Sequence, residues 1–270
     1  MVNFSVATRF VAFAAVFSLM ACGSKAPEAA KTPEEAAKRV VDGLKANKPV
    51  AAWDAMPKQY QDDVKSVITE FANNMDAELY DKAMSVATKA AKLAKDKKDI
   101  ISKMVPAPVL EQAGGYDQAV GLLSDVLDSD IKTISSLKGI DPRKFLEGPG
   151  SKVMAAAMKQ NKGMDFSKFT VAKGEGEGMV KIAGRDMKFV KVGNAWVPEE
   201  MSKDWGNMIK EAKAGMAGLK QVGAMKPKVM EALAAVDKAL DEAAKASSPE
   251  DFQKAFMPVM GQLGPMMGAF

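Results

Sequence analysis

The sequence predicts an α+β fold that is predominantly helical, a helical bundle with one small antiparallel β-meander at about residues 166–198. Three observations favour this class. Apolar residues recur at helical spacing through most of the chain. Short segments rich in β-forming residues, separated by Gly turns, are confined to one stretch. A content of 47% hydrophobic and 27% charged residues is typical of a globular body. Helices and strands are therefore segregated along the chain.

Residues 1–21 are expected to form a lipoprotein signal peptide. Arg9 is the sole charged side chain before the apolar stretch Phe10–Leu19. This stretch has the length of a signal core and is shorter than the ~20 apolar residues that cross a bilayer. The following Leu19-Met20-Ala21-Cys22-Gly23 resembles the lipobox of bacterial lipoproteins. The alternative is an ordinary cleaved signal in which Cys22 is incidental.

The lipobox resemblance implies a covalent membrane anchor on Cys22. Diacylglycerol would be transferred to its thiol, the chain cleaved before it, and the new amine acylated. Residues 22–31 would then be the lipidated Cys and a short tether. By the same resemblance, Gly23 after the Cys favours the outer membrane, with the body facing the periplasm, although exposure at the cell surface remains open.

A helical region is expected over residues 32–164. Its first helix begins at Thr32-Pro33-Glu34-Glu35, which combines an N-cap Thr, Pro at N1 and a capping-box Glu at N3. Asn47 and Pro49 should end it. The later elements are a short helical turn with Trp53 and Met56, a helix from Pro57, a helix over 77–104 capped by Asp76, a helix over Tyr116–Leu137, a brief turn from Asp141-Pro142, and a helix over Ser151–Gln160.

The meander is expected within residues 165–200, in four strands over 169–172, 179–183, 186–192 and 195–197. The run Gly174–Gly178 and the pairs Gly184-Arg185 and Gly193-Asn194 supply the turns. Residues 201–270 should form C-terminal helices that pack on the same body. One follows Pro198, one covers Pro227–Ala246, and the last begins at Ser248-Pro249 and is expected to be interrupted by Pro258.

Two stretches carry a wider resemblance. One comprises Thr32–Ala36, Leu44–Asn47, Ala52–Asp54 and Pro57–Tyr60, and the other comprises Phe189–Val192 and Gly193–Pro198. With them the chain resembles an uncharacterised family of lipidated envelope proteins from planctomycete-type bacteria. More distantly, it is similar to cystatin-like domains of the nuclear-transport-factor type, in which a first helix packs against a curved sheet. Neither resemblance brings a catalytic residue to this chain.

The composition excludes several kinds of catalytic and metal-binding site. The 270 residues include no His and one Cys, so a His-based triad, a Cys–His pair and a His- or Cys-cluster metal site are excluded. A net charge of +4 without a concentrated basic patch gives no footprint for nucleic acid. We therefore expect no enzyme, no cofactor and no metal.

Several features have a structural interpretation and a functional alternative. Gly174–Gly178 reads as a hairpin loop, since Glu175 and Glu177 would repel phosphate; Ca²⁺ capture is the alternative. The segment Ala255–Phe270, which has no charged side chain, reads as a tail packed on the core, with lipid or partner contact as the alternative. Met257, Met260, Met266 and Met267 read as packing residues, with Cu(I) as the alternative.

Two charged sets and the tryptophans are read in the same way. A Lys-rich side of the 77–104 helix should be a solvated face, with anionic lipid head groups as the alternative. Among the carboxylates no spacing singles out a catalytic pair. The tryptophans are expected to be core or interface anchors. The lysines are Lys82, Lys89, Lys92, Lys95, Lys97, Lys98 and Lys103. The candidate carboxylates are Glu70, Asp76, Glu111 and Asp117, and the tryptophans are Trp53, Trp196 and Trp205.

The sequence thus predicts a lipid-anchored protein of the bacterial envelope whose body is a non-enzymatic interaction or scaffolding module. Its expected partner is the membrane, through acyl chains on Cys22, and an envelope protein or hydrophobic ligand is a further candidate. Carriage of a hydrophobic small molecule or lipid is the alternative function. A carboxylate-based hydrolase is a weaker alternative.

Overall fold

The computed structural model describes residues 28–106, 115–160, 166–216, 218–219, 223 and 225–267. Over these ranges the chain is mostly helical with one four-stranded antiparallel sheet, and the predicted fold class is confirmed. The chain divides into two compact units. Of the described residues, 72–106, 115–138, 218–219, 223 and 225–267 belong to unit 1, and 28–71, 139–160 and 166–216 belong to unit 2. Each unit is assembled from segments that lie far apart in sequence.

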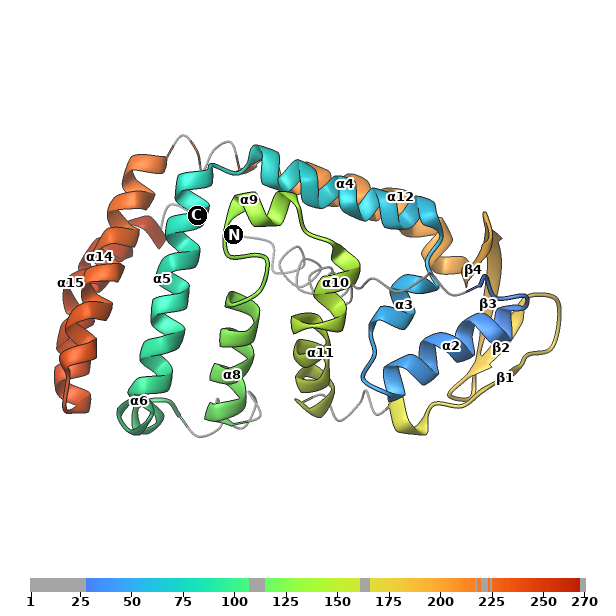
Figure 1. Ribbon diagram of the computed structural model, residues 1–270, viewed down its shortest axis with the longest axis horizontal. Coiled ribbons are helices and arrows are strands. Elements are labelled where there is room, and N and C mark those ends of the chain that lie inside the picture. The colour runs from blue at the N-terminus through green and yellow to red at the C-terminus, as the bar shows by residue number, and fades with distance from the viewer. Residues whose placement is uncertain are drawn as a thin grey trace. The chain divides into compact units, whose positions relative to one another are not determined.

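Unit 1 is built from helices. They are α5 (Ala77–Asp96), α6 (Lys98–Met104), α8 (Tyr116–Leu127), α9 (Ile134–Lys138), α14 (Lys226–Lys245) and α15 (Pro249–Met267). Helix α14 lies beside both α5 and α15 (Figure 1). Val86 and Leu93 of α5 pack there against Leu240 and Ala243 of α14, and Phe252 of α15 packs on the same cluster.

The predicted helix over 77–104 is wrong in its continuity. Asp76 does cap α5, because its carboxylate accepts a hydrogen bond from the Leu79 N–H at 3.0 Å. The helix then breaks at Lys97, where the backbone leaves the helical region (φ −110°, ψ 29°). The Lys97 ammonium instead donates to the carbonyl of Ala246, at the end of α14, at 2.7 Å. The spacing of apolar residues in the sequence does not indicate this long-range contact.

The predicted helix over Tyr116–Leu137 is also two helices. Helix α8 ends at Leu127, and α9 begins after a reciprocal cap in which Thr133 and Ser136 exchange side-chain and backbone hydrogen bonds. The intervening turn is held by α5, since the Tyr80 hydroxyl donates to the Ile131 carbonyl at 2.7 Å. Apolar residues keep a helical spacing across the break, so periodicity alone did not indicate the turn.

The interruption expected at Pro258 does not occur, because α15 continues to Met267. Proline removes one backbone donor from a helix interior and its ring crowds the carbonyl four residues earlier, at a cost of about 3 kcal/mol. Phe252 and Ala255 pack on the unit 1 cluster before it, and Val259 is buried directly after it. Packing on both sides of the proline therefore holds the helix together.

Unit 2 combines helices with the sheet. Its helices are α2 (Pro33–Lys45), α3 (Val50–Asp54), α4 (Lys58–Asn74), α10 (Pro142–Glu147), α11 (Pro149–Gln160) and α12 (Glu199–Gly215), with a 3₁₀ turn η1 at Phe166–Lys168. The strands are β1 (Val171–Lys173), β2 (Met179–Ile182), β3 (Arg185–Val192) and β4 (Ala195–Pro198), paired in chain order. The predicted meander is confirmed.

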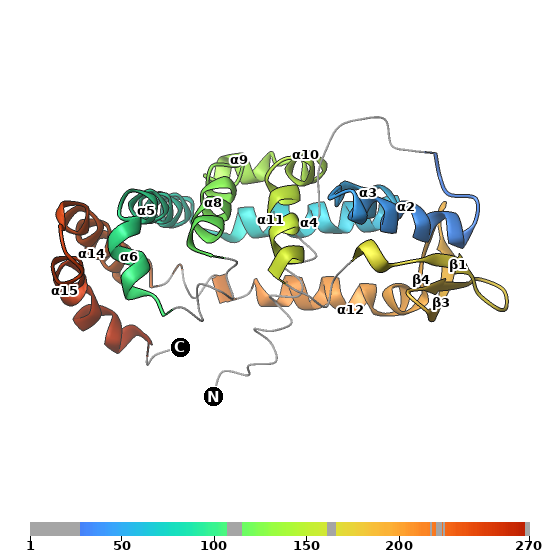
Figure 2. The same ribbon diagram turned by 90° about the horizontal axis from the view of Figure 1, so that it is seen from below.

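The sheet of unit 2 is packed on both faces. On one face lies α2 (Figure 2), and its Ala37 packs in a cluster with Val180 and Phe189 of the sheet. On the other, Val197 joins a buried cluster with Trp53, Tyr60, Val64, Leu146 and Trp205. The Tyr60 and Trp205 rings stack with centroids 4.1 Å apart. The expectation that Trp53 and Trp205 anchor a core is thus confirmed.

Candidate functional site

The predicted lipidation site lies outside the described residues. Cys22, the signal peptide and most of the tether precede Glu28, where the described part of the chain begins. Lipidation of Cys22 therefore stays a prediction. The described part of the tether, residues 28–31, leads directly into α2 of unit 2.

An open pocket of about 790 Å³ lies in unit 2. Its walls are the end of the tether, α2, α3, the start of α4 and the turn between β3 and β4. Small and apolar side chains form much of the lining, and charged side chains of both signs stand among them. The volume is in the range of small-molecule sites, about 300–1,000 Å³.

The pocket depends on a close approach of α2 and α3. A Cβ at Gly43 would lie 2.1 Å from the Cβ of Ala51, so glycine is needed where the two helices meet. The chain turns between them at Asn47, which has a positive φ of 54°. The Lys48 N–H then donates to the Gly43 carbonyl at 2.7 Å. This tight connection places Lys48 and Val50 at the pocket wall.

The start of α2 is fixed by the predicted cap, with one change. The Thr32 hydroxyl accepts from the Glu35 N–H at 3.2 Å, as expected for an N-cap. The Glu35 carboxylate reaches one residue further back than in a capping box and accepts from the Lys31 N–H at 2.8 Å. That N–H and the Arg39 guanidinium hold the pKa of Glu35 below its usual value. The tether is thereby tied to α2.

The formal charges of the lining residues balance. Three are basic and three acidic, namely Arg39, Lys48, Lys58, Glu28, Asp42 and Asp54. Half of these charges are taken up by partners within unit 2. Arg39 pairs with Glu35, Lys58 with Asp62, and Asp54 with Arg143.

The pair of Asp54 with Arg143 is the most shielded of these. The guanidinium donates to both carboxylate oxygens at 2.7 Å, and the side chains are only 12% and 14% exposed. It joins α3 to α10 behind the pocket wall. A two-pronged contact of this kind fixes orientation as well as contributing energy. Asp54 is therefore a structural residue of the wall.

Two stretches that are distant in sequence meet at this pocket. Ala36, Asp54 and Pro57 come from the first stretch on which the family resemblance rests, and Val192 and Trp196 come from the second. Trp196 was expected to be a core or interface anchor; it is half-buried, packs beside the Phe189 cluster and also lines the pocket. Sequence reasoning did not single out the pocket, because neither stretch alone contains a cavity signal.

The described candidate carboxylates each pair with a basic side chain or cap a helix. Glu70 pairs with Lys213 of α12 at 3.0 Å in unit 2. In unit 1, Asp76 caps α5 and Asp117 pairs with Lys98 at 2.6 Å. Glu111 lies outside the described residues. Each described candidate thus has a structural partner.

The carboxyl groups whose pKa is shifted do not have the raised pKa that a catalytic acid needs. A glycosidase acid has a raised pKa. The Leu79 N–H and Lys226 lower the pKa of Asp76, and Lys203 and Lys188 lower that of Glu199. Lys82 and Lys89 lower the pKa of Asp237. These groups are kept ionised by their partners, so the hydrolase alternative receives no support from them.

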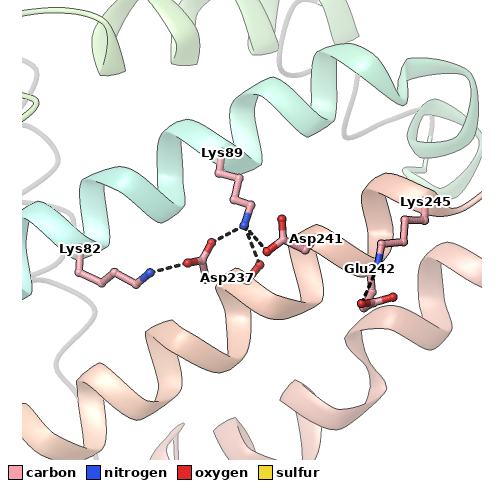
Figure 3. A network of polar contacts seen from close by, with 6 residues as sticks. All are labelled: Lys82, Lys89, Asp237, Asp241, Glu242 and Lys245. Atoms are coloured by element: carbon pink, nitrogen blue, oxygen red, sulfur yellow. Dashed lines mark hydrogen bonds and ion pairs between the residues drawn. The ribbon is translucent and has the colours of Figure 1, made fainter.

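The Lys-rich side of α5 and α6 is largely engaged within unit 1. Lys82 pairs with Asp237 of α14, and Lys89 reaches both Asp237 and Asp241 at 2.6 and 2.7 Å (Figure 3). Lys97 and Lys98 also have the partners given above. The side chains of Lys82, Lys89 and Lys98 remain 29%, 34% and 48% exposed, so water reaches this side as expected, and its ion pairs also connect helices. They join helices because α14 carries acidic side chains opposite them.

The remaining candidates are placed as follows. Gly174–Gly178 connects β1 to β2, so the hairpin interpretation is confirmed, and Glu175 and Glu177 are exposed. In the described part of the tail, Ala255 and Phe256 pack on unit 1, whereas Met257 is 67% exposed. The side chains of 260–270, including Met260, Met266 and Met267, lie outside the description.

Within the described ranges no helix is both long and apolar enough to cross a membrane. The same part of the chain contains no group of three or more His, Cys, Asp or Glu that could hold a metal ion. Comparison with protein-family models, with curated proteins and with solved structures gave no match.

Proposed function

We propose that this protein is a lipid-anchored, non-enzymatic binding module of the bacterial cell envelope, held on the outer membrane by acyl chains on Cys22. The observation that carries the proposal is the placement of the single Cys directly after a signal-like stretch, six residues before Glu28 at the edge of unit 2. Two or three acyl chains give stable anchoring, since each buried CH₂ contributes ~0.8 kcal/mol. The folded body would then act as an interaction or scaffolding module close to the bilayer.

Metabolic labelling with an alkyne fatty acid tests the anchor. The wild-type chain should take up the label and sediment with membranes, whereas Cys22→Ala should lose both properties. Ser24→Ala is the matched control, because it changes a small polar side chain two residues away and leaves the thiol intact. A Cys22→Ala chain that remains labelled and membrane-bound would contradict the proposal.

Carriage of a hydrophobic small molecule is a second candidate, and the open pocket of unit 2 favours it. Its floor includes the apolar side chains of Val50, Met56 and Val192. Native mass spectrometry of the chain purified without detergent should show a co-purifying mass. A chain that is empty after gentle purification from the envelope would count against carriage and leave the anchor untouched.

A further inference from the structure

The pocket of unit 2 combines an apolar floor with a charged rim. Val50, Ala51, Met56 and Val192 contribute apolar surface, and the Trp196 ring stands beside them. The pocket is open to solvent, so a molecule bound in it can keep one end in water. Such a lining suits an amphiphile, whose apolar part displaces water from the floor while its polar part stays at the rim.

The charges that remain free at the rim indicate which head group fits. After the internal pairs are taken into account, the Lys48 ammonium and the carboxylates of Asp42 and Glu28 have no hydrogen-bond or ion-pair partner among the described residues. All three residues are exposed. An anionic head group would meet two free carboxylates, and an uncharged one would offer hydrogen bonds but no opposite charge to any of the three. A head group with both a phosphate and an ammonium can pair with Lys48 and with the acidic side chains together.

The position of the pocket in the chain indicates where the ligand comes from. Glu28, which lines the pocket, is six residues from Cys22. Six residues span at most about 20 Å when fully extended. If Cys22 is acylated, the pocket is therefore held within about that distance of the bilayer surface. Lipid is then the amphiphile present at the highest local concentration.

We propose that the unit 2 pocket binds a zwitterionic phospholipid of the membrane that anchors the protein, with one acyl chain on the apolar floor and the phosphate and ammonium of the head group at the rim. The source of the lipid rests on the proposed anchoring, whereas the binding chemistry does not. The two can therefore be tested separately.

The binding test uses the chain from residue 22 onward carrying Cys22→Ala, which contains every described residue and has no acyl group. The probe is lysophosphatidylethanolamine with a dibrominated acyl chain, kept below its critical micelle concentration. Bromine quenches tryptophan fluorescence at contact range. Trp53 and Trp205 are 2% and 5% exposed in the unit 2 core, whereas Trp196 lines the pocket. Saturable quenching is expected, and it should be lost in Trp196→Phe.

A pair of matched variants separates pocket binding from adsorption. Ala55→Phe, in the lining, should weaken binding by about tenfold or more, because the new ring occupies the apolar floor. Ala172→Phe, at an exposed position on β1, should bind like the parent chain. Ala195→Phe offers a second filled pocket if Ala55→Phe folds poorly. Binding that survives in a folded filled-pocket variant would overturn the proposal.

Separate binding measurements test the choice of head group. Lys48→Gln and Asp42→Asn should each weaken lysophosphatidylethanolamine binding by about two- to fivefold, the range of an exposed ion pair. The brominated fatty acid and brominated monoacylglycerol should bind more weakly than the zwitterionic probe. Equal affinity for all three, or no saturable quenching at all, would overturn the proposal. None of these outcomes depends on whether Cys22 is acylated in cells.

Discussion

The two units are stabilised by different means. In unit 2 the central polar groups are shielded: Arg143 and Asp54 form a two-pronged pair, and the Trp205 indole N–H donates to Asp63 at 2.8 Å. In unit 1 the helices α5 and α14 share a small cluster around Leu240, and the flanking contacts are lysine–carboxylate pairs that water reaches. Shielded pairs are little affected by salt, whereas exposed pairs are screened by it.

This difference connects stability to the proposed functions. Unit 2 contains the pocket, and its walls are held by buried aromatic and aliphatic side chains. The unit 1 cluster has smaller buried residues, namely Val86, Leu93, Leu240 and Ala243. We therefore expect core substitutions to have their largest effects in unit 2, and salt to weaken the α5–α14 ion pairs of unit 1.

The largest expected effect is in the unit 2 core. Leu146→Ala removes a side chain that is 0% exposed and should reduce the free energy of unfolding by about 2–5 kcal/mol. Leu123→Ala is the matched control in unit 1, since Leu123 is 46% exposed and its loss should cost under about 0.5 kcal/mol. Urea unfolding followed by far-UV circular dichroism, which reports on the helices of both units, measures both. Equal losses for the two variants would contradict the proposed contrast.

The next effect concerns the β1–β2 loop. Gly178 has φ +74°, and a Cβ there would lie 2.6 Å from the carbonyl oxygen of Phe189. Gly178→Ala therefore combines an unfavourable backbone conformation with a backbone clash, and should cost about 2–3 kcal/mol. Gly184 has a similar φ of +78° but open space around it, so Gly184→Ala should cost about 1 kcal/mol. Thermal melts of the two variants measure the difference, and equal melting temperatures would show that the clash is relieved.

The sequence predicted local structure well where the signals were local. Thr32 and Asp76 cap their helices, and the Gly turns define the four strands, because capping and turn chemistry act over a few residues. It failed where a distant partner decides. The break at Lys97 depends on the end of α14, and the pocket depends on α3 and the β3–β4 turn meeting. Neither contact leaves a periodic trace in the chain.

A smaller effect is expected at the α5–α14 ion pairs of unit 1. In the folded chain, Lys82 and Lys89 hold the pKa of Asp237 below 3.8, the ordinary value for an aspartate. A lowered pKa means that the carboxylate stabilises the fold above its unfolded pKa, and that this stability is lost as the pH falls through the folded value. Asp237→Asn should thus cost about 1 kcal/mol or less at pH 7 and nothing near pH 2.

Chemical unfolding of wild-type and Asp237→Asn proteins in urea at pH 7 and near pH 2 measures this effect, and added salt should shrink the difference at pH 7. Lys58→Gln, which removes an exposed pair in unit 2, is the control and should change stability very little. A difference between wild type and Asp237→Asn that persists at pH 2 would show that shape, and not charge, is what Asp237 contributes.

The smallest effect should be a gain. The β2–β3 turn places Ala183 at φ 50° and Gly184 at φ 78°, the two positive angles that a type I′ hairpin turn requires. Alanine is disfavoured in this region, whereas asparagine tolerates it. Ala183→Asn keeps the N–H that donates to the Thr170 carbonyl at 3.0 Å and should raise stability by about 0.5–1 kcal/mol. Ala172→Asn, at an exposed position of β1, should instead lower it slightly, because asparagine is a poor strand former. A higher melting temperature for Ala183→Asn and a lower one for Ala172→Asn would show that the positive φ of Ala183 destabilises the turn. A decrease for both would contradict this prediction.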